Sequence, residues 1–132
     1  MDLKFSEADI AFRQDVVDFL NSEYPEDIKE KQDKRIPLEK EEIVRWQKIL
    51  NEKGWFTINW PVEYSGQEEL TVTQKYILQE ELAKANTPTT IPFGMGMCAP
   101  VIYTFGTDEQ KQKFLPSIQS SDVWWCQGYS EP

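Results

Sequence analysis

Residues 123–132 read Val-Trp-Trp-Cys-Gln-Gly-Tyr-Ser-Glu-Pro, and this run differs in character from everything before it. It is rich in aromatic and β-branched residues, carries no charge between Val123 and Ser130, and follows a polar turn at 119–122. That composition predicts a β-strand. Because one strand cannot pair its own backbone groups, we expect the rest of its sheet to lie in polypeptide beyond Pro132.

The residues before that run predict helices. Capping residues precede the helices expected after Ser6, Thr71 and Thr107, and the two threonines each have a glutamine three residues on, as in a capping box. Another helix is expected from Pro37 to Gly54, since proline suits a first turn and glycine suits the left-handed position after a last turn.

Three features between the helices carry further expectations. Residues 26–35 alternate charges of both signs without an apolar stripe, which predicts a solvated loop or a loose helical turn. Residues 55–61, Trp-Phe-Thr-Ile-Asn-Trp-Pro, are expected to pack beneath the helices. Glu80 and Glu81 are expected to flank an apolar helical face in water, in preference to acting as a general acid.

Residues 91–105 carry no charge and predict a helix that is apolar all round and therefore buried. Gly94 and Gly96 disfavour helix, so they suggest that another helix or a ligand chain approaches the backbone closely. Met95 and Met97 are flexible apolar side chains that could line a cavity for an acyl tail, the alternative being a plain core helix.

Together these patterns predict an all-α fold, an orthogonal or up-down helical bundle of about five or six helices, with one C-terminal β-strand stub. The bundle is expected to occupy residues 1–121. Residues 122–132 would be the first strand of a second, truncated domain.

Composition limits the kinds of partner and chemistry. The chain has 132 residues and a net charge of −9, which argues against nucleic acid or an anionic membrane as a partner. We expect no membrane span, no secretory signal and a cytoplasmic location. Cys98 and Cys126 lie on segments expected to be buried, as free thiols or, less simply, as a disulfide. With no histidine and two cysteines, no metal site is expected.

The same residues exclude several catalytic arrangements. Without histidine, Ser-His and Cys-His nucleophile pairs are excluded. The Gly94-Met95-Gly96 run lacks the third glycine of a dinucleotide fingerprint. The residue pattern alone therefore describes a helical scaffold without a catalytic constellation of its own.

Two stretches nevertheless resemble the acyl-CoA dehydrogenase family. They are residues 106–118, Gly-Thr-Asp-Glu-Gln-Lys-Gln-Lys-Phe-Leu-Pro-Ser-Ile, and residues 125–132, Trp-Cys-Gln-Gly-Tyr-Ser-Glu-Pro. Their pairing about ten residues apart is highly specific to that family. Further matches are Gly54-Trp55, Trp60-Pro61, Glu63-Tyr64, Gly66 and residues 79–83. The resemblance covers nearly the whole chain.

The resemblance implies a domain order and a reaction. In that family an N-terminal helical domain precedes a middle β-domain and a C-terminal four-helix domain, and flavin adenine dinucleotide (FAD) lies between the last two. The enzymes remove a proton from the α-carbon of an acyl-CoA thioester and transfer the β-hydride to the flavin. An electron-transferring flavoprotein then takes the electrons, and the subunits form homo- or hetero-oligomers.

The resemblance also implies roles for individual residues. Ser130 matches the hydroxyl residue that bonds the flavin pyrimidine edge, and Gln127, Gly128 and Tyr129 match positions that contact the isoalloxazine ring. Met95 and Met97 fall on the helix that walls the acyl cavity. The catalytic base is a glutamate of the C-terminal portion, so no catalytic residue is expected here and the piece alone is expected to be inactive and to hold FAD weakly or not at all.

Two alternatives remain open from the sequence. The chain could be a standalone acidic helical interaction module that docks a partner through its aromatic C-terminus. It could also belong to a non-catalytic subunit of a heteromeric acyl-CoA dehydrogenase. The residues do not specify whether the acyl group is a fatty acid, an amino-acid derivative or a sterol side chain.

Overall fold

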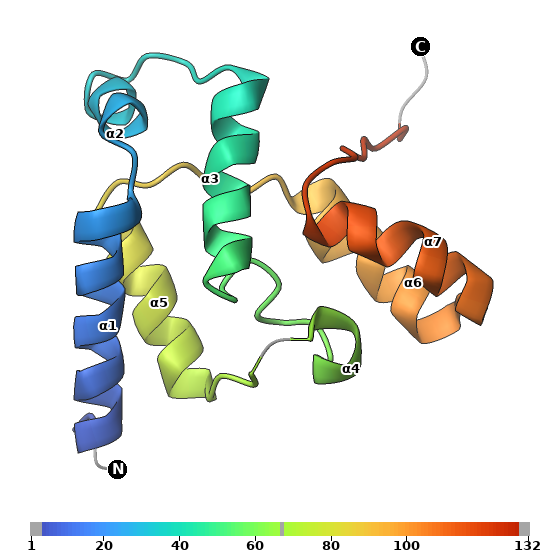
Figure 1. Cartoon of the computed structure of the whole chain (residues 1–132), viewed down its shortest axis with the longest axis horizontal. Coiled ribbons are helices and arrows are strands. Elements are labelled where there is room, and N and C mark those ends of the chain that lie inside the picture. Colours follow the sequence, from blue (N-terminus) through green and yellow to red (C-terminus); the bar gives the residue numbers. More distant parts are fainter. Residues whose placement is uncertain (1–3, 67, 130–132) are drawn as a thin grey trace. The chain divides into compact units, whose positions relative to one another are not determined.

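A computed structural model of the chain describes residues 4–66 and 68–129. These residues form seven α-helices and one π-helical turn (Figure 1). In chain order they are α1 (Glu7–Glu23), α2 (Glu26–Asp33), α3 (Lys40–Glu52), α4 (Val62–Ser65), α5 (Val72–Lys84), η1 (Phe93–Cys98), α6 (Ala99–Phe105) and α7 (Asp108–Gln119). The prediction of an all-helical chain is confirmed, with more elements than the five or six expected.

The predicted C-terminal strand is not formed. Residues 124–129 run outside any helix, and the described part of the chain contains no strand. The physical reason is that a strand exists only where a second strand supplies its ladder of hydrogen bonds, and no described segment does so.

The helix caps behave as the sequence predicts. Ser6, Thr71 and Thr107 each accept a hydrogen bond from the backbone N–H three residues on, and each takes part in a complete capping box. Gly54 has φ 85°, the left-handed conformation expected of it. The helix expected from Pro37 starts later, at Lys40, and Pro116 lies inside α7 without breaking it.

The chain divides into two compact units. The first runs to Glu42 and resumes over Glu69–Pro88, and in it α1 packs against α5 (Figure 1). Val16, Ile28 and Ile77 are fully buried. Of the two forms expected for residues 26–35, a solvated loop or a loose helical turn, the structure shows a helix, α2, because the buried side chain of Ile28 anchors an otherwise solvated segment.

An ion-pair cluster joins α1 to α5 within this unit. Arg13 donates to Glu80 (2.5 Å) and also to Glu81, and Lys84 lies 2.9 Å from Glu81. The expectation that both carboxylates lie in water was wrong for Glu81, which is only 8% exposed. Its burial is tolerated because two cations neutralise it.

The second unit comprises Ile43–Glu68 and the residues from Thr89 onward, and in it α6 packs against α7 (Figure 1). The connector prediction is confirmed, because Trp55, Phe56 and Trp60 are all buried. The prediction that residues 91–105 are buried all round was wrong. α6 and η1 present a stripe of exposed apolar side chains, Met97 (52%), Val101 (58%) and Phe105 (82%). Among the described helices, none is both long and apolar enough to cross a membrane.

The ion-pair cluster predicts acid sensitivity. Hydrogen bonds from Arg13 and then Lys84 hold the pKa of Glu80 below its ordinary value of 4.5. A carboxyl group with a lowered folded pKa stabilises the fold above its unfolded pKa, and this contribution is lost as the pH falls through the folded pKa. We therefore expect Glu80→Gln to lower the free energy of unfolding at pH 7, with the difference from wild type narrowing below about pH 4.5.

Urea titrations across pH 3–7 measure this. Glu30→Gln is the matched control, because Glu30 pairs with Lys34 on the exposed surface of α2 and exposed pairs contribute little. A Glu80→Gln deficit that stayed constant across the whole pH range would contradict the assignment.

Candidate functional site

The π-helical turn η1 is the least regular element of the second unit and carries both methionines named above. The N–H of Ala99 bonds to the carbonyl of Gly94, five residues back, which is the π register. In that register the carbonyl of Met95 would bond to residue 100, but Pro100 has no N–H. The indole Nε1–H of Trp60 donates to this carbonyl instead, at 2.9 Å.

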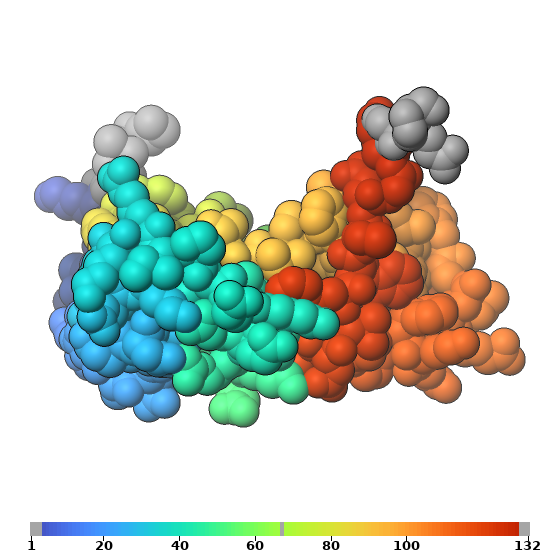
Figure 2. Space-filling model, turned by 90° about the horizontal axis from the view of Figure 1, so that it is seen from above, coloured from blue at the N-terminus to red at the C-terminus, as the bar shows by residue number. Residues whose placement is uncertain are grey.

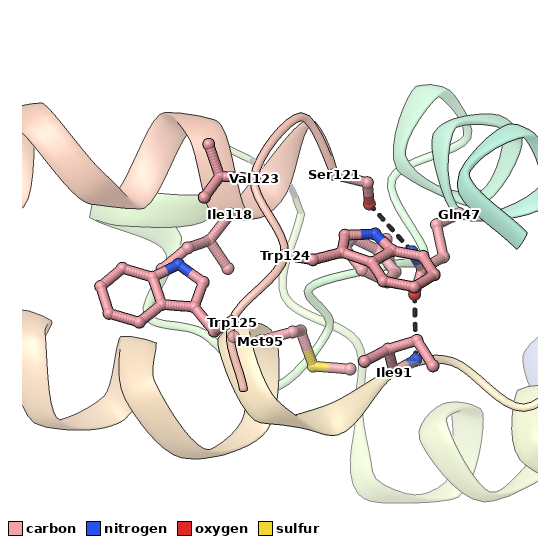
Figure 3. A pocket seen from close by; sticks show the side chains of 10 residues that line it. Gln47, Ile91, Met95, Ile118, Ser121, Val123, Trp124 and Trp125 are labelled. Atoms are coloured by element: carbon pink, nitrogen blue, oxygen red, sulfur yellow. Dashed lines mark hydrogen bonds between the residues drawn. The ribbon is translucent and has the colours of Figure 1, made fainter. Parts of the chain in front are cut away.

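A buried glutamine braces the same region. Gln47, on α3, is 2% exposed; its Oε1 accepts from the N–H of Ile91 (2.9 Å) and its Nε2 donates to the Ser121 hydroxyl (3.3 Å) (Figure 3). One side chain thus joins α3, the loop that leads into η1 and the turn that follows α7. Because both ends of the amide are bonded, its burial is tolerated.

A small pocket lies beside this glutamine and is lined by Met95 but not by Met97 (Figure 3). Its volume is about 20 Å³, room for one water molecule. This pocket by itself is too small to hold an acyl chain. Met97 lies on the exposed stripe, where a further surface would have to complete any cavity.

The segment after α7 is anchored to the same unit. The N–H groups of Asp122 and Val123 both bond to the carbonyl of Ser117, and the Asp122 carboxylate pairs with Lys48 at 2.7 Å. Trp124 then points toward Gln47 and Trp125 toward Ile118, on opposite sides of the extended chain (Figure 3).

The residues predicted to contact flavin follow directly. Gln127, Gly128 and Tyr129 are exposed, Tyr129 to 86%, and this part of the chain protrudes from the surface (Figure 2). Ser130 lies outside the described residues. A Cβ at Gly128 would meet nothing within 4 Å, so a planar ring could approach the backbone there. An open, extended segment of this kind fits a flavin edge, which requires backbone donors and acceptors.

Neither cysteine forms a disulfide. Cys98 is half-buried, and burial raises the pKa of its thiol. Cys126 is exposed, so the expectation of two buried thiols holds only in part. Across the described residues no group of three or more metal-type side chains is close enough to bind an ion.

A second hollow of this unit lies along α4 and α7 and is lined by Glu63, Tyr64, Asp108, Lys111, Gln112, Leu115 and Pro116. The ammonium of Lys111 donates to the Tyr64 hydroxyl at 3.1 Å, which raises the lysine pKa. With its cation engaged and two carboxylates beside it, this hollow is poorly suited to bind a phosphate.

Sequence reasoning did not identify Gln47 or Trp60 as bracing residues. A signal existed for the first: Gln47 falls on the apolar stripe of α3, four residues after Ile43 and one after Trp46, where an unpartnered amide would be costly. For the second, Pro100 inside an apolar helix implies that a carbonyl one turn earlier needs another donor. Neither signal names the partner.

Comparisons with known proteins match most of the chain. The family model described as acyl-CoA dehydrogenase, N-terminal domain, matches residues 6–122. The acyl-CoA dehydrogenase IpdE1 of Mycolicibacterium smegmatis is 40% identical over 93 residues, which are 70% of this chain and 24% of that protein. FadE26 of Mycobacterium tuberculosis is 42% identical over 84 residues, 63% of this chain and 20% of that protein.

Two solved structures are similar in fold. A chain of the ChsE4–ChsE5 complex of Mycobacterium tuberculosis gives a TM-score of 0.74 at 27% identity and covers 100% of this chain and 32% of its own. A chain of the Tcur3481–Tcur3483 steroid ACAD gives 0.70 at 28% identity, covering 93% and 31%. The chain thus spans about a fifth to a third of the length of these relatives.

The bracing role of Gln47 predicts a specific loss of stability. Gln47→Leu keeps the volume but leaves the N–H of Ile91 without its acceptor, which should cost about 1–3 kcal/mol of unfolding free energy. Lys48→Met is the matched control on the same helix, because it removes only the exposed pair with Asp122 and should cost less. Equal losses in urea unfolding of the two variants would count against a bracing role.

Proposed function

The chain belongs to the acyl-CoA dehydrogenase family, and from this we propose that it is the N-terminal helical part of a flavin-dependent acyl-CoA dehydrogenase. The observation that carries the proposal is the family match over residues 6–122, which includes all the described helices. In this proposal residues 1–121 form the N-terminal helical domain, and residues 122–132 begin a middle β-domain.

Bound FAD would supply the acceptor for a hydride leaving the β-carbon of an acyl-CoA thioester, while a base removes the α-proton. We assign the base to a glutamate further along the polypeptide. The paired carboxylates here, Glu80 and Glu81, are unsuited to that role because both are held by Arg13.

The contribution of this chain is to bind and orient. Gln127, Gly128 and Tyr129 lie on an exposed segment that would present backbone groups to the flavin edge, and Ser130, which follows them in the sequence, would contribute its hydroxyl. Met95 and Met97 would form one wall of the acyl cavity, closed by a surface from the rest of the enzyme. The exposed stripe of Met97, Val101 and Phe105 supports this, because apolar side chains at that spacing favour cover by another surface.

We further propose a steroid-derived acyl-CoA as the substrate. The support is that one similar structure is described as a steroid ACAD. One similar structure is described as a complex of two named proteins, and the description of the other also names two proteins, which favours a hetero-oligomer containing a second chain of this family. A cytoplasmic location and electron transfer to an electron-transferring flavoprotein complete the proposal.

The description of each similar structure names two proteins, which supports one competing function. In it, this chain belongs to a non-catalytic subunit that forms only one wall of the partner's active site. A glutamate at the base position of the complete polypeptide distinguishes the enzyme from this subunit. A standalone interaction module has weaker support, because it does not explain the family match.

The proposed reaction predicts that the complete protein, produced with its partner subunit, purifies with oxidised flavin and bleaches it on addition of a steroid side-chain acyl-CoA. Straight-chain acyl-CoA thioesters are the comparison. Residues 1–132 alone should show neither flavin nor turnover, because most of the binding contacts would be absent. A complete complex that binds no flavin would rule the enzyme out.

The wall assignment predicts a change of substrate profile. In the complete protein, Met97→Trp should raise KM for the bulkiest acyl-CoA on the order of tenfold relative to the shortest, since hydrophobic pockets discriminate by about that factor. Ile10→Trp, at an exposed position of α1, is the control. A Met97 variant with an unchanged KM profile would place the acyl group elsewhere.

A further inference from the structure

One contact links the π-helical turn to the C-terminal segment. A Cβ built on Gly94 would lie 3.0 Å from Cδ1 of Trp125 and 3.2 Å from Cγ2 of Ile118. The indole therefore rests directly on the backbone of η1, and any side chain at residue 94 would push it away. At Gly96, two residues on, the nearest atom to a built Cβ is Cβ of Pro92 at 3.9 Å, an ordinary contact.

The indole of Trp125 is held from a second direction. The ring of Phe114 meets it edge-on, with centroids 5.7 Å apart and planes at 77°. Its Nε1 is buried without a hydrogen-bond partner in the described part of the chain. Packing therefore fixes this side chain, and the shape of the ring matters more than its N–H.

η1 cannot easily shift to make room for a side chain at residue 94. Ile118, the residue of α7 whose Cγ2 lies close to Gly94, is 3% exposed and so has little free space around it. The bond from Trp60 to the carbonyl of Met95 ties the turn to the connector. A methyl group added at Gly94 should therefore move Trp125, with η1 staying in place.

Trp125 lies two residues before Gln127, which is about 7 Å along an extended chain. Because so little chain separates them, a displacement of the indole also displaces residues 127–129.

We propose that Trp125 is a positioning residue that fixes where segment 126–129 lies relative to η1. Its indole can pack on the backbone of η1 only because residue 94 is a glycine and has no side chain. This rests on the proposed function, because one packing contact then sets the position of the flavin-facing segment relative to the wall formed by Met95 and Met97. It adds a specific dependence: the indole determines how the two halves of the site lie relative to each other.

The test compares Gly94→Ala, Gly96→Ala, Trp125→Ala, Trp125→Phe and the double variant Gly94→Ala/Trp125→Ala in the complete protein. Three quantities are measured: the flavin Kd, KM and kcat across acyl-CoA thioesters, and amide hydrogen exchange of residues 126–129. Gly96→Ala is the matched control, since it adds the same methyl group to the same turn at a position where the built Cβ meets only an ordinary contact.

Gly94→Ala should raise the flavin Kd on the order of tenfold and raise KM with kcat less affected, whereas Gly96→Ala should change neither by more than about twofold. Trp125→Ala should match the Gly94→Ala effect, and the double variant should be no worse than Trp125→Ala alone, because the closest contact of the added methyl group is then gone and the space left by the indole lets Ile118 shift. Trp125→Phe should recover most of the wild-type affinity.

Two failures are distinguishable. If the wild-type complex binds no flavin, the proposed function is wrong, yet hydrogen exchange still decides the positioning role: exchange at 126–129 should be faster in Gly94→Ala than in Gly96→Ala. Equal exchange in these two variants overturns the inference. A lower Tm for Gly94→Ala with unchanged Kd, KM and exchange also overturns it, since the contact would then be merely structural.

Discussion

The carbonyl oxygen of Met95 imposes a constraint on the whole second unit. In the π register of η1 the N–H of Ala99 bonds to the carbonyl of Gly94, and Pro100 has no N–H to donate. The Met95 oxygen therefore needs a donor from outside the helix. The indole of Trp60 supplies it across 35 residues of sequence. The connector at 55–61 must therefore fold beneath η1, which explains why so aromatic a segment is buried although it forms no long helix.

Buried polar side chains do similar work elsewhere. Gln47 satisfies a backbone N–H before η1 and a hydroxyl after α7, so two loops that are far apart in sequence are tied to one helix. In the first unit the corresponding role falls to charges, because Arg13 neutralises carboxylates on α5. Gln47 and Glu81 are both buried and each bonds to two partners, and satisfied buried networks specify one arrangement where apolar packing alone would allow several.

These hydrogen bonds and ion pairs also bear on function. The side chains that could act in chemistry are the paired carboxylates and Lys111. They are already engaged in contacts that hold the fold. What the chain leaves available is an extended segment at 127–129 and an apolar stripe on η1 and α6. Those two surfaces suit binding and positioning, which is the role proposed above for this chain.

The sequence by itself determined whatever depends on neighbours within about one helical turn. Ser6, Thr71 and Thr107 bond to groups three residues away, so the beginnings of α1, α5 and α7 were predictable, and the family motifs at 106–118 and 125–132 were legible without coordinates. The tertiary structure alone decided the burial of Ile28 that makes α2 a helix, the π register of η1, the exposure of Phe105 and the absence of a strand at 124–129. The physical reason is distance along the chain: Trp60 reaches Met95 over 35 residues and Gln47 reaches Ser121 over 74, and no local pattern names a partner so remote.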